Sequence, residues 1–329
     1  MPEATANPLP RRVAPGGSYS VSCVSVALES PPGSAPLAAR AAIPALQRAH
    51  AAGVTGFDLS GLSSPEWGIE LLREAFLTPD PELVIIVGPP RADLSASAPL
   101  SDESARVEAL RTPIGRWRER ASPTRQYLVD WSDPVADRAS QPPPVRALDR
   151  LREEGLIVDY ALPLRDEEAR AKARPEVHRP LRSAPLSLLD LHALDAIERE
   201  APADRPGLIA RDVFAGGSLD GGLLGRSPLE RGPTRPPETV AALHARLDPV
   251  LKLGFLTRGR RRSLPQAALA FVLQWPWVLT AVVPLPAPEP GPGLWGRPFG
   301  DPLDATELDR LGIRVPPPTG RAPPSSDLK

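Results

Sequence analysis

The chain has 329 residues, of which 41% are hydrophobic and 24% charged, and its formal net charge is −1. This length is enough for one large domain or two small ones, and the composition is that of an ordinary globular protein. A net charge near zero gives no general attraction to nucleic acid or to a membrane surface, so we expect neither as a partner. The single cysteine, Cys23, excludes an internal disulfide and a cysteine-rich metal site.

The two ends of the chain are rich in prolines and polar residues and lack the apolar periodicity of a helix or strand. The stretch "MPEATANPLPRRVAPGG" has no apolar segment of signal-peptide length, and no apolar run in the sequence reaches the ~18 residues of a membrane span. We therefore expect a cytoplasmic protein. Residues 1–17 and 315–329 are expected to be disordered tails, which leaves residues 18–314 for a single domain.

Eight short apolar runs with the look of strands follow one another along the chain. They lie at residues 19–28, 54–59, 83–88, 126–131, 156–162, 184–190, 207–211 and 279–285. Most are apolar throughout, as strands are in a parallel sheet that is covered on both faces.

Helical patterns separate these runs, and three of them have clear ends. They lie at residues 37–53, 142–155 and 263–276. Gly53 and Gly155 are suited to close the first two helices, because glycine adopts the left-handed conformation of a helix end. Ser263 is suited to cap the start of the third, and Pro276 to stop it. Strands that alternate with helices predict a (β/α)8 TIM barrel. The alternative is an open doubly wound sheet, but no G-x-G-x-x-G follows the first strand.

The sequences of several segments resemble motifs of the aldo/keto reductase family. "GVTGFDLSG" is similar to the family's G-[IV]-N-x-F-D-T-A, "YLVDWSDP" to D-L-x-x-I-H-W-P-D-P, and "GLIARDVFAGG" to G-[IV]-[IV]-A-Y-S-P-L-A-G-G. "ALDRLREEGLIVDYAL" and "SLPQAALAFVLQWPWVLTAVVPL" resemble two further family segments, and "LDATELDRL" resembles its closing helix. The matches fall in order over residues 19–312. The resemblance implies a TIM barrel that passes a hydride from NADPH to a carbonyl.

The catalytic tetrad that the resemblance implies is mostly replaced in this chain. A tyrosine should donate the proton, with an aspartate, a lysine and a histidine beside it. The aspartate is Asp58, but the tyrosine position is Ser63, or Trp67 if the loop is longer. Neither a serine nor an indole is a useful acid at this place. The lysine position is Val87 or Gly88.

The histidine and the cofactor-binding positions also differ from the family pattern. The histidine position is Asp130, and the residues expected to hold the carboxamide of the nicotinamide are Pro163 and Leu164. The tyrosine expected to stack on the nicotinamide is Arg211. The phosphate-binding segment becomes "VPLPAPEPGPG", which has too many prolines to present backbone N–H groups. We therefore expect no cofactor and no metal, with a divergent but active NADPH-dependent reductase as the alternative.

Three charged residues are expected to meet where the strands end. Asp58, Asp130 and Arg211 end or follow strands whose carboxyl ends face one mouth of the barrel. Asp58 has lost the lysine that would pair with it, and the fork of Arg211 suits a carboxylate. One interpretation is an acid/base or ligand-anchoring set, and the other is an ion pair that only closes the mouth. Both are wrong if Arg211 lies outside the barrel mouth or more than about 6 Å from both aspartates.

A ligand pocket is expected around this set. Its predicted lining is Trp67, Trp131, Asp212, Phe214 and Trp295, although Trp131 also suits core or rim packing. We expect a pseudoenzyme, or a repurposed accessory without redox chemistry, that binds a small molecule or a protein at the barrel mouth. The sequence leaves open whether any reaction is catalysed.

Overall fold

The computed structural model describes most of the chain, with gaps between the described ranges. These are residues 9–28, 42–62, 64–89, 103–120, 124, 126–132, 144–164, 178–221, 240–259, 262–285 and 301–313. The expected C-terminal tail at 315–329 and two predicted site residues, Ser63 and Trp295, lie outside them.

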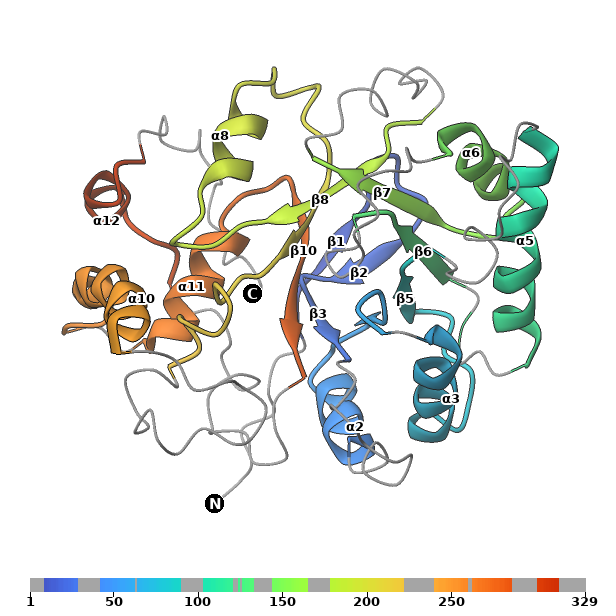
Figure 1. The fold of residues 1–329 in the computed structure, drawn as a ribbon, viewed down its shortest axis with the longest axis horizontal. Helices are drawn as coiled ribbons and strands as arrows, with labels where there is room; N and C mark the ends of the chain where they lie inside the picture. The colour runs from blue at the N-terminus through green and yellow to red at the C-terminus, as the bar shows by residue number, and fades with distance from the viewer. Residues whose placement is uncertain are drawn as a thin grey trace, which may run out of the picture.

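Eight parallel strands close into a barrel at the centre of the molecule (Figure 1), in the order β10-β3-β4-β5-β6-β7-β8-β9. The strands are β3 (Val24–Ala27), β4 (Gly56–Asp58), β5 (Val84–Val87), β6 (Gln126–Asp130), β7 (Asp159–Pro163), β8 (Leu181–Pro185), β9 (Leu208–Arg211) and β10 (Val278–Pro284). The first and last strands pair directly, with Ala281 opposite Val24, and this pairing closes the barrel. The predicted TIM barrel is confirmed.

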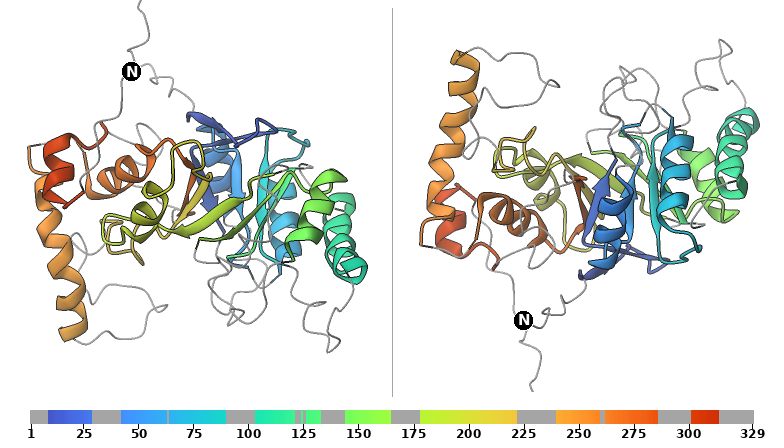
Figure 2. Two further views of the ribbon diagram at one scale, coloured as in Figure 1. Left: turned by 90° about the horizontal axis from the view of Figure 1, so that it is seen from above. Right: turned by 90° about the horizontal axis from the view of Figure 1, so that it is seen from below.

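Helices surround the strands, as Figure 1 shows. They are α2 (Ile43–Ala51), α3 (Pro65–Ala75), α5 (Glu103–Arg120), α6 (Val145–Glu153), α8 (His192–Glu198), α10 (Val240–Lys252), α11 (Leu264–Leu273) and α12 (Ala305–Arg310), with a 3-10 turn at Leu253–Leu256. Figure 2 places α10 and α12 at one end of the long axis, and α5 and α6 at the other. Among the described residues no helix is long and apolar enough to span a membrane.

The helix ends follow the chemistry predicted for them. Ser263 caps α11, where its Oγ accepts from the N–H of Gln266, and the Gln266 side chain accepts the N–H of Ser263 at 2.8 Å. Gly53 and Gly155 have φ angles of +95° and +68°, the left-handed conformation in which glycine has no steric cost. The three predicted helix ends at Gly53, Gly155 and Ser263 are therefore confirmed.

Apolar side chains fill both faces of the barrel wall. The interior is packed by Val84, Ile86, Leu128, Ala161, Leu181, Ile209, Leu279 and Val282. A larger buried cluster lies between the strands and the helices and includes nearly all of α11. This double coverage explains why the strands are apolar throughout.

A short hairpin closes the amino-terminal end of the barrel. β1 (Arg11–Val13) pairs antiparallel with β2 (Ser20–Ser22), and Tyr19 packs with the interior cluster. The Tyr19 hydroxyl donates to Oδ2 of Asp159 at 3.3 Å, and Arg12 donates to the carbonyl of Trp275 at 2.9 Å. The predicted tail at 1–17 is therefore wrong from residue 9 onwards, and residues 1–8 lie outside the described part. The run at 19–28 is also two strands, which separate at Cys23.

The sixth predicted strand is displaced along the chain. The apolar run at 184–190 suggested the strand, but β8 covers Leu181–Pro185 and the chain then turns. Leu186 and Leu188 are buried after the strand has ended, so their burial comes from tertiary packing outside a strand. The shift matters for the site, because it places Ser183 inside β8.

Candidate functional site

Alternation along the strands turns three charged side chains towards the barrel axis. In β6, Leu128 packs in the interior, and Asp130 lies two residues further on, so it points the same way. In β9, Ile209 and Arg211 repeat this spacing. Asp58 is the last residue of β4. All three lie at the carboxyl ends of their strands, which is the end of a TIM barrel that carries active sites.

The guanidinium of Arg211 joins both aspartates across the barrel mouth. Its Nη1 donates to Oδ2 of Asp58 at 2.7 Å, and its Nη2 donates to Oδ2 of Asp130 at 2.5 Å. Its Nε donates to Oδ2 of Asp130 and to Oγ of Ser183, both at 2.9 Å. Neither β4 nor β6 is a neighbour of β9 in the sheet, so these bonds cross the lumen. The expected juxtaposition of the three residues is present.

Serines complete the hydrogen bonding of the two carboxylates. Asp130 accepts from the Ser132 hydroxyl at 2.6 Å, from the Ser132 N–H at 2.9 Å, and from the Ser183 hydroxyl at 2.8 Å. Asp58 accepts from the N–H of Ser60 at 3.0 Å. Each carboxylate therefore has a fixed orientation that does not depend on Arg211 alone.

Burial makes these charges strongly dependent on one another. The side chains of Asp58 and Asp130 are 3% and 1% exposed, and that of Arg211 is 13% exposed. Burial alone would raise the pKa of Asp130, but the charge of Arg211 and the hydrogen bonds from Ser132 and Ser183 outweigh it, and the net pKa is lowered. Burial opposes the charge of Arg211, yet the two aspartates raise its pKa overall. The pair of Arg211 and Asp130 is thus ionised at neutral pH.

A cavity of about 780 Å³ opens above this network. Its wall comes from the ends of β7 to β10, from the loop after β9, and from the start of α8. The lining residues are Ala27, Ser132, Pro163, Leu164, Ser183, Ala184, Pro185, Asp190, His192, Ala193, Arg211, Asp212, Val213, Phe214, Gly216, Gly217, Asp220, Val282 and Pro284. Arg211 is the one member of the charged network that reaches the cavity surface.

The predicted pocket residues divide into two groups. Asp212 and Phe214 line the cavity, as expected. Trp67 and Trp131 do not line it; both are half-buried against the cluster between strands and helices. Trp131 follows the inward-facing Asp130, so strand alternation turns its ring outward. Trp67 lies in the first turn of α3 and packs towards the barrel wall. For these two tryptophans, core packing is the correct interpretation.

Asp212 holds an unusual backbone conformation at the edge of the cavity. Its φ is +49°, which is uncommon for a residue other than glycine and which aspartate tolerates better than most. The carboxylate accepts the N–H of Gly216 at 2.6 Å, and the carbonyl accepts the N–H of Ala215 at 2.9 Å. These bonds hold the loop after β9 in a compact turn that presents Asp212 beside Arg211.

The three tyrosines of the chain all lie away from this cavity. The Tyr19 hydroxyl donates to Asp159 at the opposite end of the barrel. Those of Tyr127 and Tyr160 donate outside the barrel, to the carbonyl of Trp117 at 3.3 Å and to Asp149 at 2.7 Å. Burial and the neighbouring carboxylate raise the pKa of Tyr160. No tyrosine hydroxyl among the lining residues is therefore available as a proton donor.

A side chain at Gly88 would crowd the turn after β4. A Cβ atom built on Gly88 lies 3.1 Å from the carbonyl oxygen of Ser60, which is closer than most Cβ contacts. The neighbour is backbone, so a lysine at position 88 requires the turn after β4 to shift by a few tenths of an ångström.

The sequence interpretation missed five polar residues of the site. Ser132, Ser183, Asp190, His192 and Asp220 line the cavity, and the two serines bind Asp130. Ser183 was missed because the strand had been placed three residues too late. The signal was present in "LRSAP", where Leu181 and Ser183 alternate with outward residues. Ser132 follows Asp130 by two residues, a spacing at which a serine N–H commonly bonds a carboxylate.

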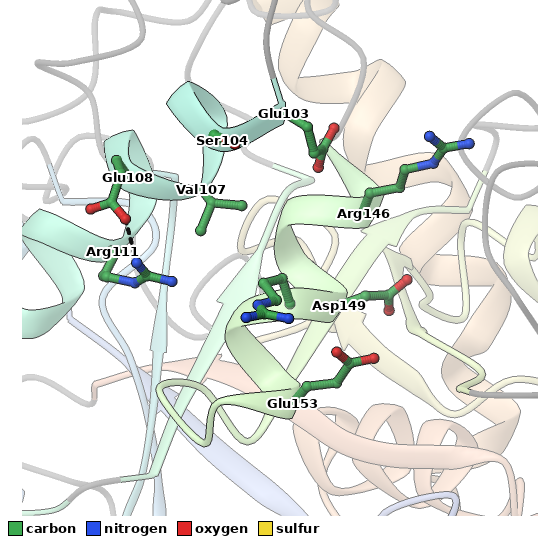
Figure 3. Close-up of a pocket in the computed structure, with 9 residues that line it drawn as sticks. Glu103, Ser104, Val107, Glu108, Arg111, Arg146, Asp149 and Glu153 are labelled. Carbon is green, nitrogen blue, oxygen red and sulfur yellow. Dashed lines mark hydrogen bonds and ion pairs between the residues drawn. The ribbon is translucent and has the colours of Figure 1, made fainter.

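A second cavity, of about 500 Å³, lies on the outside of the barrel between α5 and α6 (Figure 3). Arginines and carboxylates alternate along it and pair locally. Arg111 pairs with Glu108 and Glu154, and Arg150 also pairs with Glu154. A groove lined by solvated charges of both signs that pair locally has no preferred ligand class, so the mouth cavity is the better candidate. Among the described residues, no group of three His, Cys, Asp or Glu side chains is placed to hold a metal ion.

Comparison with known proteins finds solved structures with the same fold, but it finds no relative by sequence. No protein-family model matches the chain, and no curated protein matches it. The apo aldo-keto reductase AKR11C1 of Bacillus halodurans is 15% identical, with a TM-score of 0.59 over 92% of this chain and 95% of that one. A Bombyx mori aldo-keto reductase in complex with NADP is 13% identical, with a TM-score of 0.60 over 93% and 92%. The glycerol dehydrogenase AKR11B4 of Gluconobacter oxydans is 17% identical, with a TM-score of 0.58 over 95% and 99%.

Proposed function

We propose that this aldo/keto reductase-type barrel has lost reductase function and binds a small molecule at its mouth without redox chemistry. The observation that carries the proposal is the bridge from Arg211 to both Asp58 and Asp130. It occupies the place at which the resemblance implies a nicotinamide ring, with the catalytic groups around it. An always-charged guanidinium held by two carboxylates offers no movable proton.

The residues at the mouth do not fit NADPH. The position implied for the stacking tyrosine is Arg211, and its side chain is turned into the lumen by its bonds to the aspartates. The carboxamide positions are Pro163, which has no N–H, and Leu164, whose N–H lies 3.3 Å from the carbonyl of Ser183. Asp190, Asp212 and Asp220 also line the cavity and would repel the phosphates of a dinucleotide. For these reasons we propose that no nicotinamide cofactor is used.

Proton transfer by the network itself is also disfavoured. A general acid or base works best when its pKa lies near the working pH. The pKa of Asp130 is lowered and that of Arg211 is raised, so both stay charged at neutral pH. Of the two sequence-based interpretations, the network therefore suits ligand anchoring and closure of the mouth better than acid/base catalysis.

The cavity supports a binding role. Its volume of about 780 Å³ lies within the ~300–1,000 Å³ range of small-molecule sites. Its wall combines apolar residues with a few polar groups held by rigid strand ends, which is the usual composition of such sites. A protein partner at the same mouth is the second form of this proposal. The cytoplasmic location expected from the sequence also belongs to the proposal.

A steady-state assay tests the loss of reductase function. Purified protein is mixed with NADPH or NADH and a panel of aliphatic and aromatic aldehydes and ketones, and cofactor oxidation is followed by absorbance. We expect no oxidation above the protein-free rate with any carbonyl. Carbonyl-dependent oxidation that is lost in the Arg211→Ala variant would support the alternative, a divergent but active reductase.

A further inference from the structure

The guanidinium group of Arg211 is held along two of its edges by the protein. At one edge, Nη1 donates to Oδ2 of Asp58 at 2.7 Å, and Nη2 donates to Oδ1 of the same carboxylate at 3.4 Å. At the next edge, Nη2 and Nε donate to Oδ2 of Asp130 at 2.5 Å and 2.9 Å, and Nε also donates to Oγ of Ser183. These bonds use the N–H of Nε, both N–H groups of Nη2 and at least one of the two on Nη1.

The flat face of this guanidinium is therefore the main part that a ligand can reach. Arg211 lines the mouth cavity with 13% of its side chain exposed, although both edges that carry two donors are closed. A guanidinium is planar and weakly hydrated, and it stacks on the faces of aromatic rings. The bonds to Asp58 and Asp130 fix its plane before a ligand arrives, so stacking costs little further side-chain freedom.

The strand ends around the cavity present rings in place of hydrogen-bond donors. Three strands end in proline, with Pro163 in β7, Pro185 in β8 and Pro284 in β10, and all three prolines line the cavity. Proline has no N–H, so none of these three residues offers a backbone donor to a ligand. Phe214, from the loop after β9, adds an aromatic side chain to the same wall. This part of the lining suits a ligand with apolar faces and few hydrogen-bond acceptors.

We propose that the mouth cavity binds an uncharged, flat aromatic ring system that stacks on the guanidinium face of Arg211. This inference rests on the proposed function and names the class of ligand for it. The ring lies on the guanidinium, and its edges contact Phe214 and the prolines of the strand ends. Cation–π attraction and the burial of the ring both favour this arrangement. The phosphate groups that the proposed function excludes are absent from such a ligand.

An anion is a weaker candidate for the same surface, although an arginine reaches it. A carboxylate or phosphate typically binds a guanidinium through two parallel N–H donors along one edge. In Arg211, the two edges of this kind already serve Asp58 and Asp130. An aromatic ring needs none of these donors, because it approaches the plane of the guanidinium from its face.

Two probes with one carbon skeleton separate stacking from simple burial. 2-Naphthol is a flat aromatic ring system, and decahydro-2-naphthol is its saturated counterpart with the same hydroxyl group. The binding of each is measured by calorimetry at neutral pH, where both are uncharged. Burial alone favours the saturated probe, which is the more apolar of the two, whereas stacking favours the aromatic one. We expect 2-naphthol to bind at least about threefold more tightly than decahydro-2-naphthol.

A matched pair of variants connects this preference to the face of Arg211. Arg211→Lys removes the planar group and keeps a positive charge beside the two aspartates. In this variant, the preference for 2-naphthol should be lost. Arg179→Lys is the control, because Arg179 pairs with Asp204 at the surface, and it should leave the preference unchanged. Circular dichroism shows whether both variants are folded.

A second measurement uses the wild-type protein and does not depend on the folding of a variant. The Nε–H of Arg211 donates to Asp130 and to Ser183, and these bonds slow its exchange with water. Its signal in a proton–nitrogen correlation spectrum should move upfield as 2-naphthol is added, because the ring current of an aromatic ring shields protons that lie over its face. Decahydro-2-naphthol has no ring current and should not produce this upfield shift.

The outcomes separate this inference from the proposed function. Equal or tighter binding of decahydro-2-naphthol, an unchanged preference in folded Arg211→Lys, no binding of 2-naphthol at millimolar concentration, or a stationary Arg211 signal would each overturn the inference. Micromolar binding of NADPH in the same calorimeter would instead overturn the proposed function. The two failures are distinguishable, because the comparison of the two naphthols is made without any nucleotide.

Discussion

Nη1 of Arg211 lies 2.7 Å from Oδ2 of Asp58, although the two residues stand 153 positions apart in the chain. Arg211 ends β9 and Asp58 ends β4, and these strands are not neighbours in the barrel, so the bond spans the lumen. A contact of this kind connects opposite walls of the mouth independently of the sheet hydrogen bonds. It accounts for both the closed floor of the cavity and the charge of that floor.

Replacement of Arg211 by alanine should be strongly destabilising. The change leaves two carboxylates buried without their cation, and the loss of one partner of a buried pair typically costs about 3–5 kcal/mol. Chemical denaturation at neutral pH measures the loss. Arg179→Ala is the matched control, because Arg179 pairs with Asp204 on the surface and its loss should cost less than about 1 kcal/mol.

The same variant distinguishes a structural network from a ligand-anchoring one. If Arg211 only closes the mouth, probe binding by the folded variant stays within about twofold of that of the wild type. If the network anchors the ligand, binding falls much further than stability does. A loss of stability no larger than that of Arg179→Ala would contradict the buried cross-lumen pair itself.

Acid should destabilise the protein partly through Asp130. Its pKa is lowered in the folded state, so the unfolded chain takes up the proton more readily. The stabilisation by this group is complete above the unfolded-state pKa of ~3.9 and is lost as the pH falls through the folded-state pKa. In urea denaturation between about pH 5 and about pH 2.5, Asp130→Asn should be less stable at the upper end and decline less steeply. A slope equal to that of the wild type and of the exposed control Asp248→Asn would show that Asp130 is not the group responsible.

The fold could be predicted from sequence because its signals are local and repeated. Apolar runs, glycines at helix ends and the Ser263 cap each depend on a few neighbouring residues, and they agree with one another. The errors occurred where tertiary packing decides. Leu186 and Leu188 are buried although they lie outside a strand. The residues "RRV" have no strand pattern of their own, but they form β1 because β2 pairs with them at the end of the barrel.

The site could be predicted only in part. The alternation of strand residues and the shared mouth of a barrel were enough to bring Asp58, Asp130 and Arg211 together. Ser183 was missed because β8 was expected three residues too late, and Ser132 because its spacing of two residues from Asp130 was not used. Trp131 was wrongly assigned to the pocket because it follows the site residue Asp130. Alternation along the chain turns its side chain away from the barrel axis, towards the helices.

Restoring the tetrad residues should not restore reduction. Replacement of Ser63, Gly88 and Asp130 by tyrosine, lysine and histidine removes one carboxylate partner of Arg211 and forces a Cβ to within 3.1 Å of the Ser60 carbonyl. It leaves Arg211, Pro163 and the carboxylates of the cavity wall unchanged, so under the proposed function the variant still binds no hydride donor. NADPH-dependent reduction of an aromatic aldehyde by the purified, folded triple variant would show that a cofactor site exists. A circular dichroism spectrum is the control for folding.

Two glycine-to-alanine changes should have opposite effects. Gly155 has a φ of +68°, so alanine there should cost about 1–2 kcal/mol, although no atom crowds the site. Gly115 lies within α5 with no atom within 4 Å of an added Cβ and without a positive φ, so alanine should stabilise by about 0.5–1 kcal/mol. Thermal melts of the two variants give the comparison. Equal shifts would contradict the helix end at Gly155.

A calorimetric titration of NADPH into the purified protein tests the central claim most directly. The account predicts no dissociation constant tighter than the millimolar range, which corresponds to about −4 kcal/mol. The proposed reason is that Arg211, with its two aspartates, stands where the resemblance implies the nicotinamide, and that the carboxylates of the cavity wall repel phosphate. A micromolar dissociation constant that weakens when Arg211 is replaced by alanine would contradict the account.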